Sequence, residues 1–278
     1  WERKRTKAIL NWLLSADSGT VHKGDVEVTH TDGTNRWLGL RAVNLTGDPT
    51  VGGLVVNIHD ITDSKRADDE LARLAFHDSL TGLTNRVLFR DRIEKALKRT
   101  GRTGNDIAIV YLDIDGFKNV NDIHGHEAGD QVLQEVSGRL LSTVRPTDTV
   151  ARLGGDEFAI LIENSQCPLD EASKLADRVL SSLAEPLGGQ PIVLSANIGI
   201  VLSDGLSTVS SMLSDADIAM YQAKTTGKAK WTLFDPGMRA AAVEFEGLQV
   251  DLLSALAENQ FRLMYQPIVE LASQQVVG

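Results

Sequence analysis

The chain has 278 residues and carries 28 Lys and Arg against 38 Asp and Glu, which gives a formal net charge of −10. At roughly 150 residues per domain, this length predicts about two domains and excludes a small scaffold that needs disulfides to fold. The acidic balance disfavours broad binding to the phosphate backbone of DNA or to anionic lipid, so we predict no DNA partner.

The first 75 residues predict a small antiparallel sheet followed by a helix. Apolar residues alternate over 37–40 and 54–58, and the turn pairs Asp32-Gly33 and Gly52-Gly53 separate the predicted strands. After Asp63 the pattern changes to a charged helix with an apolar stripe, over residues 63–75, which is suited to connecting or pairing domains.

From Ile107 onward, the order of predicted elements is strand, helix, two strands, helix and strand. These elements are the strand 107–112, the helix 127–144, a strand pair around Gly154-Gly155, the helix 170–184 and the strand 192–201. The βαββαβ order is that of a ferredoxin-like or palm-type α/β (α+β) fold. A helix over 207–224, a strand over 231–234, an amphipathic helix through 245–256 and a strand over 261–265 follow.

Two carboxylates occupy positions that this fold would bring together. Asp113 ends an apolar strand and Asp156 follows the Gly-Gly turn, so both would lie on neighbouring strands. Mg²⁺ prefers such hard oxygen ligands and keeps open positions for phosphate. From this pair alone, a tight hairpin with solvated acids is an equally good interpretation.

Five separated segments resemble one protein family. Residues 154–158 read GGDEF, and four further segments match in order: FHDSLTGLTNR at 76–86, DIDGFKNVND at 113–122, GHEAGD at 125–130 and YQAKTTGK at 221–228. Together they resemble the GGDEF diguanylate cyclases over residues 76–235. The resemblance implies that two GTP molecules, one on each of two facing subunits of a homodimer, condense into cyclic di-GMP and two pyrophosphates.

The resemblance also implies the catalytic and metal-binding residues. Two Mg²⁺ ions per active site, or Mn²⁺ as an alternative, would be held by Asp113, Asp156 and the Ile114 carbonyl. Asp113 and Asp156 would therefore be catalytic residues. Glu157 would assist deprotonation of the 3′-hydroxyl or bind metal, and a solvated turn acid remains the alternative. Asp115 shares a strand face with Asp113, and we expect it to orient the site or hold a lysine.

Substrate contacts follow from the chemistry of GTP. Guanine presents adjacent N1–H and N2–H₂ donors, which a carboxylate accepts as a pair, and Asp130 suits this role, with Asn121 adding an amide contact. Without the resemblance, Asn121 would be read as a turn residue. The triphosphate contacts are assigned to Lys118, Lys224 and Lys228 and to the backbone at Gly116, Phe117 and Gly155. Lys228 stands where the family more often has arginine, so we expect a weaker contact there.

A second site is predicted five residues before the glycine pair begins. Arg145 and Asp148 resemble the inhibitory RxxD site of the family, where cyclic di-GMP itself would bind and slow the enzyme. An Arg/Asp pair after a helix is otherwise ordinary surface charge.

The flanking regions resemble parts of two other domains. Residues 1–62 look like the later half of a PAS sensor domain, 63–75 and 236–260 are predicted linker helices, and 261–278 resemble the start of an EAL phosphodiesterase domain. The Glu-Ala-Leu metal motif is absent from this sequence, so we expect no hydrolysis of cyclic di-GMP by this chain. Two alternatives to the cyclase stay open: a catalytically silent module that binds GTP or cyclic di-GMP and controls a downstream phosphodiesterase, and a dimerisation module built on the linker helices.

Cysteine content and hydropathy bear on location. Cys167 is the only cysteine, which excludes an intrachain disulfide and favours a cytoplasmic protein. No apolar run approaches the roughly 20 residues that span a bilayer. The chain begins at Trp1 rather than Met, so we expect a piece of a longer protein, which could be attached to a membrane elsewhere.

Overall fold

The computed structural model describes residues 17, 19–30, 32–103, 106–186, 193–227, 229–258 and 260–276. The chain divides into two compact units, Trp1–His77 and Asp78–Gly278, each of which is described by itself. Residues 1–16 of the predicted PAS-like segment lie outside the described residues, as do Ile192 and Lys228.

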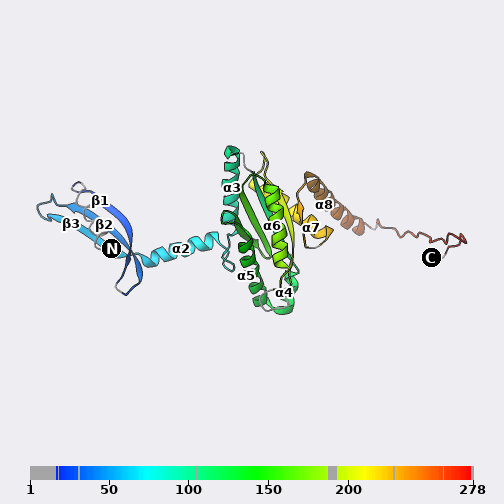
Figure 1. Cartoon of the computed structure of the whole chain (residues 1–278), viewed down its shortest axis with the longest axis horizontal. Coiled ribbons are helices and arrows are strands. Elements are labelled where there is room, and N and C mark those ends of the chain that lie inside the picture. The colour runs from blue at the N-terminus through cyan, green and yellow to red at the C-terminus, as the bar shows by residue number, and fades with distance from the viewer. Residues whose placement is uncertain are drawn as a thin grey trace. The chain divides into compact units, whose positions relative to one another are not determined.

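The first unit contains the predicted antiparallel sheet and the helix after it (Figure 1). The sheet has the order β1-β2-β3, with β1 at Val21–Thr29, β2 at Asn35–Leu45 and β3 at Gly53–Asp60, and α2 at Thr62–Phe76 follows. The Thr62 hydroxyl donates to Asp60 Oδ1 (2.5 Å) and accepts from the Trp37 N–H (2.9 Å). These bonds fix the start of α2 to the sheet of its own unit.

The second unit is a five-stranded sheet covered by helices. Its strand order is β5-β6-β4-β7-β8, antiparallel except for the parallel pair β7 and β8. The strands are β4 (Asp106–Asp115), β5 (Thr149–Gly154), β6 (Glu157–Ser165), β7 (Ser195–Leu202) and β8 (Lys230–Leu233). The helices are α3 (Arg86–Thr103), α4 (Phe117–His124), α5 (His126–Thr143), α6 (Pro168–Leu183), α7 (Val209–Thr226) and α8 (Pro236–Ala257). The predicted α/β fold class is confirmed.

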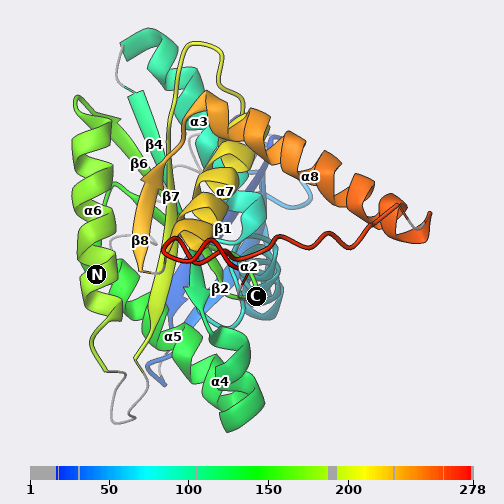
Figure 2. The same ribbon diagram turned by 90° about the vertical axis from the view of Figure 1, so that its right-hand side faces the viewer.

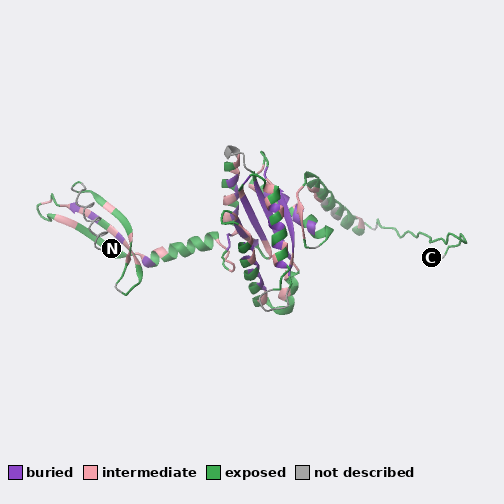
Figure 3. Cartoon of the chain, in the orientation of Figure 1, coloured by how far each residue is buried: buried purple, intermediate pink, exposed green. Residues whose placement is uncertain are grey.

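Alternate residues of β4 pack on opposite faces of the sheet, as the two-residue period of a strand requires. Residues 108, 110, 112 and 114 join α5 and α6 in one core, whereas 107, 109 and 111 join α3 and α7 in the other. Figures 1 and 2 show the helices on either side of the sheet, and Figure 3 shows the buried strands between them. Because Asp113 continues the odd-numbered series, its side chain lies on the face that α3 and α7 cover.

Helix α7 packs directly on the backbone of β7 at Gly199. A Cβ atom at this glycine would lie 2.0 Å from the Ala216 carbonyl oxygen and 2.4 Å from the Met220 nitrogen, both backbone atoms of α7. These distances are far below van der Waals contact, so only glycine permits this approach. The close packing places the end of α7 beside the end of β4.

The structure differs from the sequence predictions in three elements. Helices α3 and α4 are not among the predicted elements, and the predicted strand over 261–265 is wrong. Among the described residues, 260–268 form no regular structure, and Leu263, Met264 and Tyr265 are each at least 79% exposed. A strand requires a partner for its backbone hydrogen bonds, and the apolar alternation of this segment finds none in the described part of the chain.

No helix in the described part of the chain combines the length and the apolar character that crossing a bilayer requires.

Candidate functional site

The two predicted carboxylates lie together at one end of the sheet. Asp113 of β4 is paired directly with Glu157 of β6, the residue after Asp156. The Ile114 N–H donates to the Asp156 carbonyl oxygen across the same strand pair (3.3 Å). The strand register thus brings Asp113, Ile114 and Asp156 to one place, although the two aspartates are 43 positions apart in the sequence.

An ion pair connects this place to α7. The Lys224 Nζ lies 2.5 Å from Asp113 Oδ2, and the Asp113 side chain is only 11% exposed. This hydrogen bond raises the pKa of Lys224 above its ordinary value. Burial, reinforced by the negative charge of Asp113, raises the pKa of Asp156. The positive charge of Lys224 therefore offsets the negative charge of Asp113, one of the two neighbouring carboxylates.

Asp115 holds two side chains of the neighbouring strand. Its carboxylate accepts hydrogen bonds from Ser195 Oγ (2.8 Å) and Asn197 Nδ2 (2.7 Å), both on β7. Its charge also contributes to the raised pKa of Lys224. Asp115 therefore occupies a supporting position next to Asp113, with serine and asparagine rather than lysine as its hydrogen-bond partners.

The glycine turn between β5 and β6 is held by an arginine. Gly154 and Gly155 have φ angles of 147° and 53°, in the region that glycine adopts most readily. Arg152 donates to the Gly155 carbonyl oxygen from Nε (3.0 Å) and Nη2 (2.8 Å), and its Nη1 lies 3.1 Å from Asp78 Oδ1. Arg152 thus connects the turn to the first residue of the second unit.

The ion pair of Asp78 with Arg152 gives a pH-dependent prediction. Burial raises the pKa of Asp78, but hydrogen bonds from Thr81 and Arg152 outweigh it and hold the pKa below 3.8. We expect Asp78→Asn to lower the free energy of unfolding by about 1–3 kcal/mol at pH 7, because a mostly buried guanidinium loses its charged partner. The stabilisation is complete above pH 3.8 and is lost as the pH falls through the lower folded-state value.

Urea unfolding of both proteins between pH 7 and pH 3 measures this difference. Asp91→Asn is the control, because Asp91 forms an exposed ion pair with Lys95 on α3 and should change stability little. If the difference in the free energy of unfolding between Asp78→Asn and the parent grew as the pH fell below 4, the ion pair of Asp78 with Arg152 would not be its source.

Glu157 is held from two sides. Its Oε2 lies 3.4 Å from Arg86 Nη2, and it accepts a hydrogen bond from the buried Tyr111 hydroxyl. Arg86 also donates from Nε to the Leu153 carbonyl oxygen (3.0 Å), so it holds both strands that flank the glycine turn. Burial and then the charge of Glu157 raise the pKa of Tyr111. These contacts fix the position of the Glu157 carboxylate.

Arg86, Tyr111 and Asp217 are not among the residues predicted for the site. Asp217 lies on α7 seven residues before Lys224; partial burial and then the charge of Asp113 raise its pKa, which the charge of Arg86 lowers. The seven-residue spacing puts Asp217 and Lys224 on one face of the helix, and Tyr111 precedes Asp113 by two residues on the strand. Both periodicities were available in the sequence, whereas the position of Arg86 depends on the tertiary fold.

The predicted base contacts lie on α4 and α5. Asn121 is partly buried on α4, and Asp130 is exposed near the start of α5, directly after the buried Gly129. Lys118 is exposed on α4. Gly116 caps α4 with a φ of 74°, and the first N–H groups of this helix, beginning at Phe117, have no acceptor within it. Anions bind well to such groups.

The predicted inhibitory residues lie at the loop between α5 and β5. Asp148 Oδ2 accepts from the Arg145 backbone N–H (3.0 Å), while the Arg145 side chain lies 3.1 Å from Glu171 Oε2. Asp148 Oδ1 is buried without a hydrogen-bond partner, and burial raises the pKa of this carboxyl. The positive charge of Arg178 lowers the pKa of Asp148. Arg178 is thus a second arginine near Asp148, which was not predicted from the sequence.

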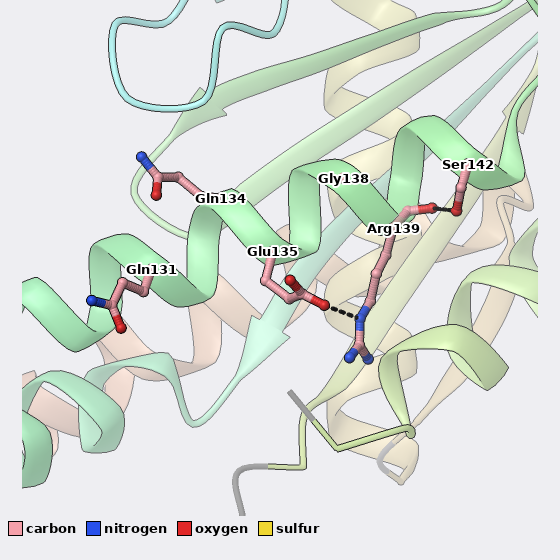
Figure 4. A pocket seen from close by; sticks show the side chains of 6 residues that line it. All are labelled: Gln131, Gln134, Glu135, Gly138, Arg139 and Ser142. Carbon is pink, nitrogen blue, oxygen red and sulfur yellow. Dashed lines mark hydrogen bonds and ion pairs between the residues drawn. The ribbon is translucent and has the colours of Figure 1, made fainter. Parts of the chain in front are cut away.

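A hollow of about 400 Å³ lies elsewhere, along α5 (Figure 4). None of its lining residues is a predicted site residue, and Arg139 there binds Glu135, the carbonyl oxygen of Ser182 in the last turn of α6, and the carbonyl oxygens of Glu185 and Pro186 after it. These bonds hold the end of α6 against α5, so we interpret Arg139 as a residue that stabilises the packing of these two helices.

Comparison with known proteins places these residues in a family context. Residues 75–230 match the family described as diguanylate cyclase, GGDEF domain. The chain is 38% identical over 257 residues to the bifunctional diguanylate cyclase/cyclic di-GMP phosphodiesterase MucR of Pseudomonas aeruginosa, covering 88% of this chain and 37% of MucR. It is 38% identical over 217 residues to the cyclic di-GMP phosphodiesterase PdeR of Escherichia coli, covering 77% of this chain and 32% of PdeR. The chain spans about a third of the length of these relatives.

Solved structures show the same fold. The GGDEF domain of TpbB (YfiN) from Pseudomonas aeruginosa is 36% identical, with a TM-score of 0.57, over 60% of this chain and 98% of that chain. The diguanylate cyclase SiaD of the same species, solved with its activator SiaC, is 32% identical, with a TM-score of 0.54, over 62% of this chain and 66% of that chain. The family match covers more than half of the residues. This chain therefore belongs to the family of GGDEF diguanylate cyclase domains.

Proposed function

We propose that the chain is an active diguanylate cyclase that condenses two GTP molecules into cyclic di-GMP with release of two pyrophosphates. The observation that carries the proposal is the arrangement of Asp113, Asp156 and Lys224 beside the glycine turn. Carboxylates for a divalent cation and a cation for phosphate are the groups that phosphoryl transfer requires. Gly154 and Gly155 carry no side chain that would keep a nucleotide from the backbone.

The donor set fits Mg²⁺ better than a closed metal site. Among the described residues, no group of three or more His, Cys, Asp or Glu side chains could hold a metal ion. Two carboxylates and the Ile114 carbonyl leave positions for phosphate oxygens and water, which is the coordination that Mg²⁺ favours with nucleotides. When bound, the ion would lower the pKa of the attacking hydroxyl and neutralise charge on the phosphates.

The protein groups act by positioning. Lys224 supplies a positive charge next to Asp113, and the first N–H groups of α4, which have no acceptor within the helix, supply donors for phosphate oxygens. Asn121 and Asp130 are proposed to bind guanine. Glu157, held by Arg86 and Tyr111, is proposed to receive the proton of the 3′-hydroxyl. Each chain would bind one of the two GTP molecules, so we propose a homodimer as the active form.

A second candidate is a silent module that binds nucleotide and controls a phosphodiesterase. It is favoured by the names of two relatives, the cyclic di-GMP phosphodiesterases PdeR and NbdA, which are 38% and 36% identical to this chain. Incubation with GTP and Mg²⁺ distinguishes the two functions. Pyrophosphate and cyclic di-GMP appearing in a 2:1 ratio would support the cyclase, and GTP binding without either product would replace it with the silent module.

Product feedback at Arg145 and Asp148 gives a further prediction. Arg145→Ala should raise the concentration of cyclic di-GMP that halves the initial rate by about tenfold or more, because a charged contact to guanine is lost. Basal turnover should stay within about twofold. Inhibition is measured by adding cyclic di-GMP to initial-rate assays.

Lys174→Ala is the matched control for Arg145→Ala. Lys174 is an exposed base on α6, paired with Asp170, close in sequence to Glu171 but outside the RxxD pair. Equal sensitivity of the parent and Arg145→Ala to cyclic di-GMP would rule out feedback through this arginine.

A further inference from the structure

Gly129 of α5 lies where a side chain would collide with the predicted guanine-binding amide. A Cβ atom at this buried glycine would lie 2.0 Å from Asn121 Oδ1 and 3.0 Å from its Cγ, with Phe117 Cζ at 3.3 Å. Carbon and oxygen atoms in van der Waals contact are more than 3 Å apart, so an alanine at 129 and the present position of the Asn121 amide exclude each other.

Helix geometry alone does not call for glycine at this position. Gly129 lies within α5, where glycine costs about 1 kcal/mol relative to alanine. A Cβ atom at Gly138, the second glycine of the same helix, would meet nothing within 4 Å, so that position has no such restriction. Both glycines belong to α5, Gly129 as its fourth residue and Gly138 further along, and only Gly129 has a side chain of another helix in the space of a Cβ atom.

The collision would move the Asn121 side chain rather than the helices. The Asn121 carbonyl oxygen accepts from the Gly125 N–H (2.9 Å), which fixes the backbone at the end of α4. The amide itself is attached by only two rotatable bonds and can turn away from a new methyl group. Asp130 follows Gly129 directly and stays in place, so guanine would keep its carboxylate contact and lose the amide contact.

We infer that Gly129 is a positioning residue for guanine, which acts by leaving the space that the Asn121 amide occupies beside Asp130. The inference rests on the proposed function, since it assigns to Asn121 and Asp130 the binding of the GTP base. It identifies a residue that contacts no substrate and yet sets the affinity for the nucleotide.

The test compares Gly129→Ala, Gly138→Ala, Asn121→Ala and the double variant Gly129→Ala/Asn121→Ala. The readouts are KM and kcat for GTP, and the Kd of the α,β-methylene analogue of GTP, whose bridging carbon blocks pyrophosphate release. We expect Gly129→Ala to raise KM and Kd by about tenfold with kcat within about threefold, as the loss of one hydrogen bond predicts. Its thermal midpoint should be equal to or above that of the parent, as for Gly138→Ala, which should leave KM unchanged.

The double variant separates positioning from general disruption. If Gly129 acts through Asn121, then Gly129→Ala should add no more than about twofold to the KM of Asn121→Ala. A further tenfold increase in KM when Gly129→Ala is added to Asn121→Ala would overturn the inference while leaving the guanine site intact. An unchanged KM in Gly129→Ala alone would do the same. If Asn121→Ala itself left KM and Kd unchanged, the proposed guanine site would be wrong and the inference would fall with it.

Discussion

Asp156→Asn is expected to lower the rate of cyclic di-GMP formation by about 10²- to 10³-fold. The substitution keeps the shape of the side chain but removes one of the two carboxylates at the end of the sheet, and with it the electrostatic stabilisation that dominates phosphoryl transfer. The rate is measured as pyrophosphate release at saturating GTP and Mg²⁺, with chromatography of the cyclic dinucleotide.

The same variant should not be less stable than the parent. Burial and the charge of Asp113 disfavour the ionised form of Asp156, so an uncharged amide relieves repulsion and should keep or raise the thermal midpoint. Asp106→Asn, at the exposed opposite end of β4, is the matched control and should retain full activity. A folded Asp156→Asn protein with more than a tenth of the parent rate would refute the proposed role of this carboxylate.

Lys224→Met should lower kcat/KM for GTP by about 10²-fold or more. The substitution removes the charge that is proposed to bind phosphate, and it also leaves the nearly buried Asp113 without its ion-pair partner. Lys224→Arg keeps the charge and should restore part of the activity, since a point charge rather than a fixed geometry is proposed at this position. Initial rates over a range of GTP concentrations separate the effects on KM and kcat.

Lys98→Met is the control for loss of a lysine. Lys98 is exposed on α3 and forms an ion pair with Glu94 of the same helix, so its removal should change kcat/KM less than twofold. If Lys224→Met also stayed within threefold of the parent, the triphosphate would have to bind elsewhere.

The fold could be predicted where hydrophobic periodicity is strong. The apolar run before Asp113 and the helical spacing of Val132, Val136 and Leu140 produce the buried sheet and the inner face of α5 that the structure contains. Helix α4 escaped prediction because it has only eight residues, none of them buried, and begins at a left-handed glycine. The segment 261–265 alternates like a strand, but a pattern cannot supply the partner that a strand needs.

The sequence predicted that Asp113 and Asp156 lie together on neighbouring strands, but it did not predict the side-chain interactions around them. The positions of Asp113 and Asp156 follow from a strand end and a turn, which are local features. The contact of Lys224 with Asp113 joins residues 111 positions apart, and that of Arg86 with Glu157 joins residues 71 apart, so both depend on the packing of helices on the sheet. Lys224 was expected on the triphosphate, and the structure adds that it neutralises a carboxylate.

The close approach of α7 to Gly199 bears on how this sequence can diverge. Two backbone atoms of the helix occupy the volume that any larger residue would need, so even alanine at 199 would displace α7 and carry Lys224 away from Asp113. Selection for turnover would then also act on Gly199, although this residue is packed under α7 and is not proposed to contact nucleotide. Among descendants of this gene, position 199 should vary as slowly as Asp113 and Asp156, and replacement of Gly199 should accompany loss of the proposed cyclase activity.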